Sequence, residues 1–430
     1  MTTLAPPPEV LEIADVLERA GFETWCVGGA LRDALLGHPH HDWDLATAAT
    51  PQQMRKLFKR TVPIGVEHGT VGVLDRNGMM HEVTTFRRDA KTDGRHAEVE
   101  FGVSLDEDLA RRDFTINAIA WSPSKQLLHD PFAGQRDLVA KLVRAVGDPP
   151  ARMREDRLRA LRAIRFASRF GFRIEPATWD AIVASAPELK RLSAERVRQE
   201  LEKTMEQVAR PSEALALWQQ ARMFDELLVA LVGVSDTALR SLDCLPMPDP
   251  PGRPQRRSNR MAALFLELGG ARAGAAMKAL RASNSDVKWV AEMAERWARL
   301  GALMGEALLA GRPVPDATVR GWVAIIGRTR VSAFLRLAAA RWGAERALNR
   351  PAPAAPVVRA LYRAALRSAW RDPVELADLA VDGDDLRGAG IAAGPQLGRA
   401  LDALLTWVLE DPSRNTRDAL IARARQANGS

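Results

Sequence analysis

The sequence predicts an α+β head domain followed by a longer region that is entirely helical. Up to about residue 148, short apolar runs of strand length alternate with helical stretches, a pattern typical of a small α/β or α+β domain. After residue 150, Leu, Ala, Arg and Glu dominate and strand-like runs are rare, which indicates helices. The expected strands are TWCVG (24–28), DWDLA (42–46), TVGVL (70–74), HEVTTF (81–86) and QLLHD (126–130).

The helical region is divided by two proline-rich breaks. Residues 153–172 are predicted to form one amphipathic helix that Gly171 closes. Proline clusters at 246–257 and 350–357 stop helices and mark linkers, and the arginines near the first of them (253, 256, 257 and 260) are expected to be solvated. The remaining helices are expected at 193–208, 212–230, 259–284, 286–309, 316–325 and 329–347.

Length and composition narrow the class of protein. A chain of 430 residues is too long for one ordinary core, so two to four packed units are expected. The net charge is +7, and only nine of the 61 basic residues are lysines, which leaves 52 arginines. Arginine pairs well with phosphates and base edges, so this balance favours a nucleic-acid or nucleotide partner; a codon bias towards arginine is the alternative explanation.

The cysteines and the distribution of apolar residues argue against a disulfide-rich, a CxxC zinc-binding, a secreted or a membrane-spanning protein. The two cysteines, Cys26 and Cys244, cannot build a disulfide framework or a CxxC zinc site, and Cys26 is expected to be a buried strand residue. The N-terminal residues MTTLAPPPEV do not resemble a signal peptide, and no apolar stretch reaches about 18 residues. We therefore expect a cytoplasmic protein without a membrane partner; no motif specifies its oligomeric state.

The first motif with a chemical meaning is VGGALRD (27–33), in which an apolar strand runs through Gly28 and Gly29 into a helix. Glycines let a backbone approach a phosphate closely, and a helix N-terminus offers free N–H groups. Arg32, one turn inside that helix, could reach a triphosphate. The alternative is a plain tight turn, which alone would account for the two glycines.

The second motif is HDWDLAT (41–47). In a strand, residues i and i+2 point to the same face, so Asp42 and Asp44 would project side by side, about 7 Å apart. Two carboxylates held in this way are costly unless a cation neutralises them, which predicts a two-metal Mg²⁺ site. Glu82, on the alternating run HEVTTF, is the candidate for a third carboxylate. Two solvated acids and an exposed strand glutamate are the alternatives.

The third motif, RRDFTINA (111–118), places two cations beside an acceptor. Arg111 and Arg112 would bind phosphates, whereas Asp113 would accept from a ribose hydroxyl and cap a helix beginning at Phe114. The alternative is a capped helix whose arginines are solvated.

The fourth motif is REDRLRALRAIRF (154–166), in which Asp156, Arg159, Arg162 and Arg165 recur at intervals of three on one slowly rotating helix face. A carboxylate accepts from an exocyclic amine and arginine donates to a ring acceptor. Because cytosine and adenine both present an amine beside a ring nitrogen, one Asp–Arg pair could accept both and reject uracil and guanine. The alternative is a salt-bridged, exposed helix face.

In their order and spacing, these four motifs resemble the class II tRNA nucleotidyltransferases, which share ancestry with bacterial poly(A) polymerases. The resemblance is dense over residues 22–172 and resumes at VDGDDLRGAGIAAGPQLGRAL (381–401). It implies a polymerase-β-like palm in a head domain, with a neck that recognises the base and a body and tail that bind the acceptor arm and elbow of tRNA. The implied domains are the head at 1–150, the neck at 151–215, the body at 216–350 and the tail at 351–430.

The resemblance also implies a role for each matching residue. Asp42 and Asp44 would be the catalytic metal ligands. The third catalytic carboxylate, Glu82, is inferred from its expected strand and not from the resemblance. The incoming nucleotide would be bound by its triphosphate, its ribose and its base. The residues implied are Gly29, Arg32 and Arg112 for the triphosphate, Asp156 and Arg159 for the base, and Arg162 and Arg165 close to the nucleotide. Gly28 for the triphosphate and Asp113 for the ribose are inferred from the motifs described above.

Two sequence features choose among the relatives of this family. No histidine follows His129, so the metal-binding HD domain that some CCA-adding enzymes append is not expected in these residues. The segment TVPIGVEHGTVGVL (61–74) is similar to CCA-adding members, and the arginine-rich signature of proteobacterial poly(A) polymerases is missing there.

The leading expectation is therefore the addition of C, C and A to tRNA 3′ ends from CTP and ATP. A poly(A) polymerase is the close alternative. A nucleotidyltransferase acting on small molecules would fit the first two motifs but would leave the long helical region unexplained. An inactive RNA-binding protein would require a broken DxD motif or a lost base-reading pair, and both are intact.

Overall fold

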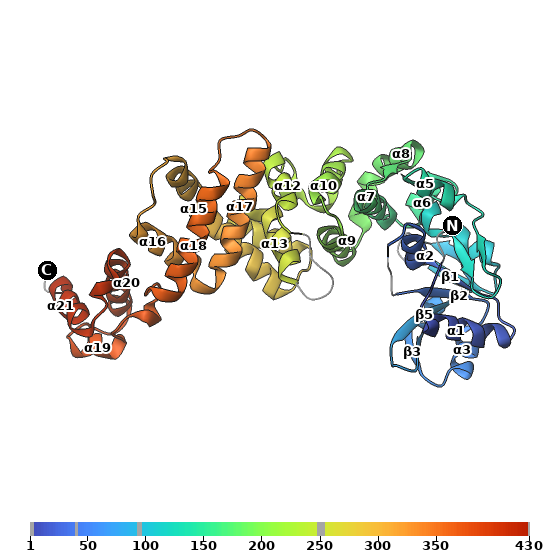
Figure 1. Ribbon diagram of the computed structural model, residues 1–430, viewed down its shortest axis with the longest axis horizontal. Helices are drawn as coiled ribbons and strands as arrows, with labels where there is room; N and C mark the ends of the chain where they lie inside the picture. Colours follow the sequence, from blue (N-terminus) through green and yellow to red (C-terminus); the bar gives the residue numbers. More distant parts are fainter. Residues whose placement is uncertain (1–3, 39–41, 93–96, 247–253, 429–430) are drawn as a thin grey trace. The chain divides into compact units, whose positions relative to one another are not determined.

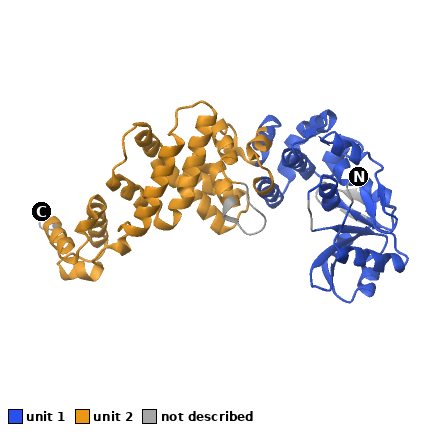
Figure 2. Ribbon diagram, in the orientation of Figure 1, with its two compact units in different colours: residues 1–204, 217–227 blue, residues 205–216, 228–430 orange. Residues whose placement is uncertain are grey.

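A computed structural model describes residues 4–38, 42–92, 97–246 and 254–428. The chain forms two compact units, residues 1–204 with 217–227 and residues 205–216 with 228–430 (Figure 2). Within the residues just given, the first unit holds all the strands and the second is helical (Figure 1). An α+β head followed by a helical remainder is therefore confirmed. Within the described residues, no helix is both long enough and apolar enough to cross a lipid bilayer.

A mixed, seven-stranded sheet organises the first unit in the order β3-β4-β5-β2-β1-β8-β9. Its β2–β5 pair is parallel and the other pairs are antiparallel. Helices α1 (Pro8–Arg19), α2 (Gly28–Leu35) and α3 (Pro51–Leu57) pack on this sheet. The strands are β1 (Thr24–Val27), β2 (Asp44–Thr47), β3 (Thr61–Gly65), β4 (Thr70–Leu74), β5 (Met80–Thr85), β8 (Ala120–Ser122) and β9 (Leu127–His129).

Two small ribbons and several helices complete the first unit. Strands β6 (Arg87–Thr92) and β7 (Ala97–Phe101) pair antiparallel, and β10 (Leu142–Val143) pairs in parallel with β11 (Arg173–Ile174). The apolar core between sheet and helices includes Trp25 and is wholly buried. The later helices are α4 (Leu105–Ala110), α5 (Gly134–Val139), α6 (Pro149–Glu155), α7 (Leu158–Phe170), α8 (Pro176–Ser185), α9 (Ala194–Gln207), which runs on into the second unit, and α11 (Met223–Leu227).

The second unit is a succession of packed helices that ends in a small core of its own. Residues between Leu379 and Ala424 bury eight apolar side chains against one another, which holds the last three helices together. The helices are α10 (Pro211–Gln220), shared with the first unit, α12 (Asp236–Asp243), α13 (Pro254–Phe265), α14 (Gly269–Ala279), α15 (Asn284–Leu309), α16 (Asp316–Ile326), α17 (Val331–Ala347), α18 (Ala355–Arg371), α19 (Gly383–Gly388), α20 (Pro395–Glu410) and α21 (Arg417–Asn428).

Three of the predicted helices are broken in the structure. The expected helix 212–230 ends at Gln220 because Arg222 adopts a left-handed conformation (φ 57°). The expected helix 259–284 breaks at Gly269, whose φ of +72° an L side chain rarely adopts. The helix predicted over 153–172 is divided at Asp156, although Gly171 closes it in the αL conformation as expected.

The arginines beside the first linker are not a uniformly solvated cluster. Arg260 is buried, with a relative exposure of 1%, and donates to the carbonyl oxygens of Met205 (2.8 Å), Val208 (2.9 Å) and Leu245 (3.1 Å). These carbonyls lie at the C-terminal ends of two helices, where the amide N–H groups of a following turn are missing. Burial lowers the pKa of Arg260 to about 10, so it stays charged at neutral pH. Arg257 forms an ion pair with Glu206, whereas Arg253 lies outside the described residues, as does the side chain of Arg256.

Replacing Arg260 with methionine should destabilise the protein strongly. The substitution keeps the side-chain volume but leaves three buried carbonyls without a donor, at about 1–3 kcal/mol for each unsatisfied group. We expect the apparent melting temperature of the full chain to fall by several degrees. The control is Arg210→Met, which removes an exposed ion pair with Glu213 worth about 1 kcal/mol or less. Equal melting temperatures for the two variants would contradict the capping role.

Candidate functional site

The predicted glycine turn and the predicted carboxylates meet at the end of two paired strands. In the antiparallel register of β1 and β2, Val27 lies opposite Asp44, so Gly28 begins α2 next to that carboxylate. A Cβ atom on Gly28 would lie 3.0 Å from Asp44 Oδ2 and 3.6 Å from Arg112 Nη1. The φ of Gly28 is +81°, so both conformation and space require glycine here.

Three carboxylates influence one another beside this turn. Strand β2 begins at Asp44, so Asp42 is exposed and lies just before the strand rather than within it, contrary to the predicted strand 42–46. Strand β5 runs parallel to β2 with Val83 opposite Leu45, which brings Glu82 to the level of Asp44. Burial raises the pKa of Asp44 to about 7, and the negative charges of Glu82 and Asp42 contribute to the rise, whereas Arg112 opposes it.

This concentration of negative charge fits a cation that takes only some of its ligands from the protein. Across the described residues, no group of three or more His, Cys, Asp or Glu side chains is placed to hold a metal ion by itself. Mg²⁺ commonly takes one or two carboxylates and fills its remaining positions with water and phosphate oxygens. Asp42 and Asp44 fit that description, and Glu82 acts on Asp44 as a neighbouring charge.

A buried aspartate that sequence reasoning missed holds the two neighbouring arginines. Asp108, in α4, accepts from Arg111 Nη2 (2.8 Å) and Arg112 Nη2 (3.2 Å). Burial would raise the pKa of Asp108, but these two guanidinium groups hold it below its usual range. The signal in the sequence was an acid three and four residues before the Arg–Arg pair on a short helix.

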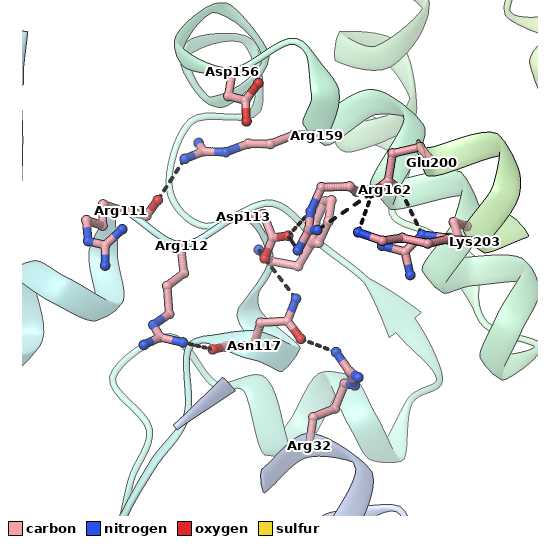
Figure 3. A network of polar contacts seen from close by, with 12 residues as sticks. Arg32, Arg111, Arg112, Asp113, Asn117, Asp156, Arg159, Arg162, Glu200 and Lys203 are labelled. Carbon is pink, nitrogen blue, oxygen red and sulfur yellow. Dashed lines mark hydrogen bonds and ion pairs between the residues drawn. The ribbon is translucent and has the colours of Figure 1, made fainter. Parts of the chain in front are cut away.

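Arg32 is more enclosed than the sequence suggested. Its guanidinium has a relative exposure of 4%, donates to Asp33 and Asn117 Oδ1, and lies 4.9 and 4.8 Å from the ring centres of Phe166 and Phe170. In Figure 3 it points towards Asn117. The group stays beside the glycine turn, because a Cβ atom on Gly29 would lie 3.5 Å from Arg32 Nη2.

Asn117 connects this turn to the aspartate of the third motif. Its Oδ1 accepts from Arg32 (2.6 Å), its Nδ2 donates to Asp113 Oδ1 (2.8 Å), and its backbone oxygen accepts from Arg112 (Figure 3). Arg162, from α7, donates to Asp113 Oδ2 at 2.9 Å. A continuous polar chain therefore runs from α2 through residues 113–117 to α7.

Asp113 is held as an anion but does not cap a helix as predicted. Only a short 3-10 helix follows, Thr115–Asn117, and its N-terminal cap position is occupied by Phe114. Burial alone would raise the pKa of Asp113, yet the charge of Arg162 and the hydrogen bond from Asn117 outweigh it and hold the pKa at about 2.

The carboxylate of the fourth motif lies outside the helix that carries its arginines. Asp156 has extended backbone between α6 and α7, where its Oδ1 accepts from Leu158 N (3.0 Å). Both of its oxygens accept from Arg196 Nη2 of α9, at 3.0 and 2.9 Å. The shared helix face predicted for residues 156–165 is therefore wrong for Asp156, because α6 ends at Glu155 and α7 begins only at Leu158.

The three arginines predicted on this face, Arg159, Arg162 and Arg165, have different partners. Arg159 donates to Arg111 O at 2.7 Å and to Glu155, which places it one residue from Arg112 (Figure 3). Arg165 is buried and donates to Glu200 at 2.7 Å. The structure thus brings Asp44, Gly28, Arg112 and Arg159 into one region, whereas Arg32 and Arg165 face internal partners.

Comparison with known proteins identifies the family. A family model described as "Poly A polymerase head domain" matches residues 24–144, and one described as "Probable RNA and SrmB- binding site of polymerase A" matches residues 171–231. The CCA-adding enzyme of Latilactobacillus sakei is 34% identical over 436 residues, covering 99% of this chain and 100% of that protein. The chain belongs to the CCA-adding enzyme family.

Two further comparisons support the same membership. The CCA-adding enzyme of Streptococcus suis is 46% identical over 199 residues, a match that spans 46% of this chain and about half (49%) of that relative. The crystal structure of the Bacillus stearothermophilus CCA-adding enzyme in complex with CTP superposes with a TM-score of 0.75 at 33% identity, covering 99% of this chain and 98% of that one. The predicted family and the polymerase-type head with helical remainder are confirmed.

For this member of the CCA-adding family, metal binding should release a proton near neutral pH. Below about pH 4, Asp44 is protonated whether the chain is folded or not. Between about pH 4 and 7, only the folded chain holds that proton. The free energy of unfolding without metal therefore falls as the pH rises through this range, and it becomes constant above about pH 7. A cation needs the ionised form, so it should displace about one proton at pH 6 and much less at pH 8.

Calorimetric titration of Mg²⁺ in two buffers of different ionisation enthalpy measures this proton release directly. The apparent affinity for Mg²⁺ should rise as the pH approaches 7 and then become constant. Asp44→Asn is the control, because an amide has no proton to lose at these pH values. Equal proton release at pH 6 and pH 8 would contradict the prediction.

Asn117→Asp should weaken binding of the nucleotide without weakening binding of RNA. The new carboxylate still accepts from Arg32 but faces Asp113 with a like charge, which should displace both groups. We expect KM for the nucleotide to rise about tenfold, equivalent to about 1.4 kcal/mol. The matched control is Asn77→Asp, an exposed asparagine whose amide also faces a carboxylate, that of Glu9. An unchanged KM for Asn117→Asp would remove Asn117 from the site.

Proposed function

We propose that this chain adds cytidine, cytidine and adenosine to the 3′ end of tRNA, using CTP and ATP and releasing pyrophosphate. The observation that carries the proposal is the meeting of Asp44, Gly28 and Arg112 in a chain related over its full length to CCA-adding enzymes. The Bacillus stearothermophilus enzyme described above was crystallised in complex with CTP. The reaction would take place in the cytoplasm, where tRNA and nucleoside triphosphates are available.

Asp42 and Asp44 would hold Mg²⁺ at the end of strand β2. Two bound ions would activate the attacking 3′ hydroxyl and stabilise the leaving pyrophosphate. Asp44 accepts this role because its carboxylate is crowded by Glu82 and Asp42, so that the ionised form needs a positive neighbour at neutral pH. Glu82 contributes charge rather than direct ligation.

The triphosphate would lie along the Gly28–Gly29 turn, where the N-terminal N–H groups of α2 are exposed to it. Arg112, held by Asp108, supplies a cation directly beside Asp44. Arg32 would help to position this region through its hydrogen bond to Asn117. Asp113, which remains ionised, would accept from a ribose hydroxyl.

Asp156 and Arg159 would read the base. The carboxylate of Asp156 would accept from the exocyclic amine of cytosine or adenine, and Arg159 would donate to the adjacent ring nitrogen. The position of Arg159 against Arg111 O supports this role, since it lies next to the proposed triphosphate site. Arg162 and Arg165 would support the nucleotide from the next turns of α7 through Asp113 and Glu200.

The functional division of the chain would follow the proposed domains. The head, 1–150, would carry out the transfer, and the neck, 151–215, would select the nucleotide. The body, 216–350, and the tail, 351–430, would bind the acceptor arm and elbow of tRNA. The matched RNA-binding family model at residues 171–231 supports an RNA path that begins at the neck.

The experiment that tests the function is incubation of the protein with tRNA lacking its 3′ end and each labelled triphosphate singly. Incorporation of two cytidines, followed by one adenosine when ATP is added, is expected. Long tails from ATP alone would overturn the proposal in favour of a poly(A) polymerase, an activity that the description of the matched head model favours. RNA binding without pyrophosphate release would indicate an inactive RNA-binding protein.

Asp42→Ala should abolish nucleotide addition and leave tRNA affinity nearly unchanged. The exposed carboxylate is proposed to bind metal, whereas affinity for tRNA should come mainly from contacts of basic residues with phosphates. Turnover and the Kd for tRNA should be measured on the same preparation. A loss of tRNA affinity comparable to the loss of turnover would contradict this separation of roles.

Arg159→Ala should relax the choice among nucleoside triphosphates more than it slows a single correct addition. The substitution removes a donor proposed for the ring nitrogen, a contact worth about 1–3 kcal/mol of discrimination. Single-turnover rates with CTP, ATP, UTP and GTP give the selectivity. Unchanged ratios among the four would rule out base reading by this residue.

A further inference from the structure

Four arginines form a row along the exposed side of α18 that turns by about 40° around the helix axis at each step. Arg359, Arg363, Arg367 and Arg371 recur every four residues, and all four are exposed. Residues four apart in a helix lie on one face, about 6 Å apart along the axis, so the row extends over about 18 Å. We call these four residues the α18 arginine stripe.

The positive charge of the stripe is not balanced by the protein. Helix α18 contains no aspartate or glutamate, and within the described part of the chain none of the four arginines has an ion-pair or hydrogen-bond partner. Neighbouring acids are already engaged, since Asp372 pairs with Arg320 and Asp378 with Arg328. Many other arginines of this protein are paired with acids, whereas the positive charges of the α18 arginine stripe have no acidic partners among the residues that the structure describes.

An exposed aromatic side chain lies on the same face. Trp370, 11 residues after Arg359, has a relative exposure of 64%, although a tryptophan is usually largely buried. Its angular position in the helix falls between those of Arg359 and Arg363, about 20° from the first. The guanidinium of Arg328 lies 5.8 Å from the ring centre of Trp370. The opposite side of α18, which includes Leu361 and Ala365, is buried.

We propose that the α18 arginine stripe binds the sugar–phosphate backbone of the tRNA substrate and that Trp370 stacks on an unpaired base beside it. A row of unpaired cations about 6 Å apart suits a strand that carries a phosphate about every 3 Å of its axis, and an exposed ring among cations suits a base. The inference rests on the proposed function for the identity of the RNA. An acidic protein would match the charge of the stripe but not the exposed ring.

The decisive variant is the double substitution Arg363→Glu with Arg367→Glu. The matched control is Arg55→Glu with Arg136→Glu, two exposed arginines on α3 and α5 of the head, outside the proposed tRNA-binding regions, whose side chains also lack a partner in the described residues. We expect the stripe variant to bind tRNA at least about tenfold more weakly at about 0.1 M salt, and the slope of log Kd against log salt to fall by about 2. The control variant should bind as the wild type does.

Substitutions of Trp370 test the stacking contact without changing the charge of the protein. Trp370→Ala should weaken tRNA binding about fivefold or more without changing the salt slope, because stacking on a base is worth about 1–3 kcal/mol. Trp370→Phe, which keeps a flat ring, should restore most of the affinity. Equal affinity of the alanine variant and the wild type would remove the stacking contact.

Nucleotide addition separates a failure of this inference from a failure of the proposed function. At saturating tRNA the stripe variant should keep the wild-type kcat and show only a higher KM for tRNA. If the wild type adds no nucleotide, the proposed function fails, but the comparison of tRNA affinities still stands. A second variant, Arg363→Gln with Arg367→Gln, removes the charge without reversing it. If both variants keep the tRNA affinity and the salt slope of the wild type, the inference is overturned and α18 is left as a surface for a protein partner.

Discussion

The close packing of Asp44 against the Gly28 turn is the constraint on which the rest of the head depends. The strand register of β1 and β2 fixes that packing, so a Cβ atom on Gly28 would lie only 3.0 Å from the Asp44 carboxylate. The carboxylate is consequently removed from water while Glu82 and Asp42 add negative charge. A group in this position binds positive charge strongly, whether it comes from Arg112 or from a metal ion.

A chain of polar contacts extends this constraint into the helices of the neck. Arg32, Asn117, Asp113 and Arg162 follow one another across α2, the 3-10 helix and α7. Each is buried or half-buried, so losing any one would leave its neighbours without a partner, which is costly at low dielectric. The proposed triphosphate and base contacts are therefore parts of one rigid arrangement within the first unit.

Much of the fold followed from local sequence patterns. The run TVGVL is strand β4, and Gly171 closes α7, because alternation of apolar residues and a glycine with positive φ are local signals. The motif glycines and aspartates were also recognisable from their spacing. What local patterns could not supply were partners distant in sequence: Arg196 for Asp156, 40 residues away, and the carbonyls around Arg260. Asn117 lay within a recognised motif, but only the fold shows that its amide faces two partners.

The break between α6 and α7 leaves the orientation of Asp156 to a residue outside its own motif. A side chain in the middle of a helix has its direction fixed by its own backbone, whereas Asp156 is steered mainly by a guanidinium that belongs to α9. If Asp156 reads the base, discrimination between nucleotides depends on how two separate helices are packed together. Substitutions in the apolar contacts of α9 would then alter fidelity without touching any residue that meets the nucleotide.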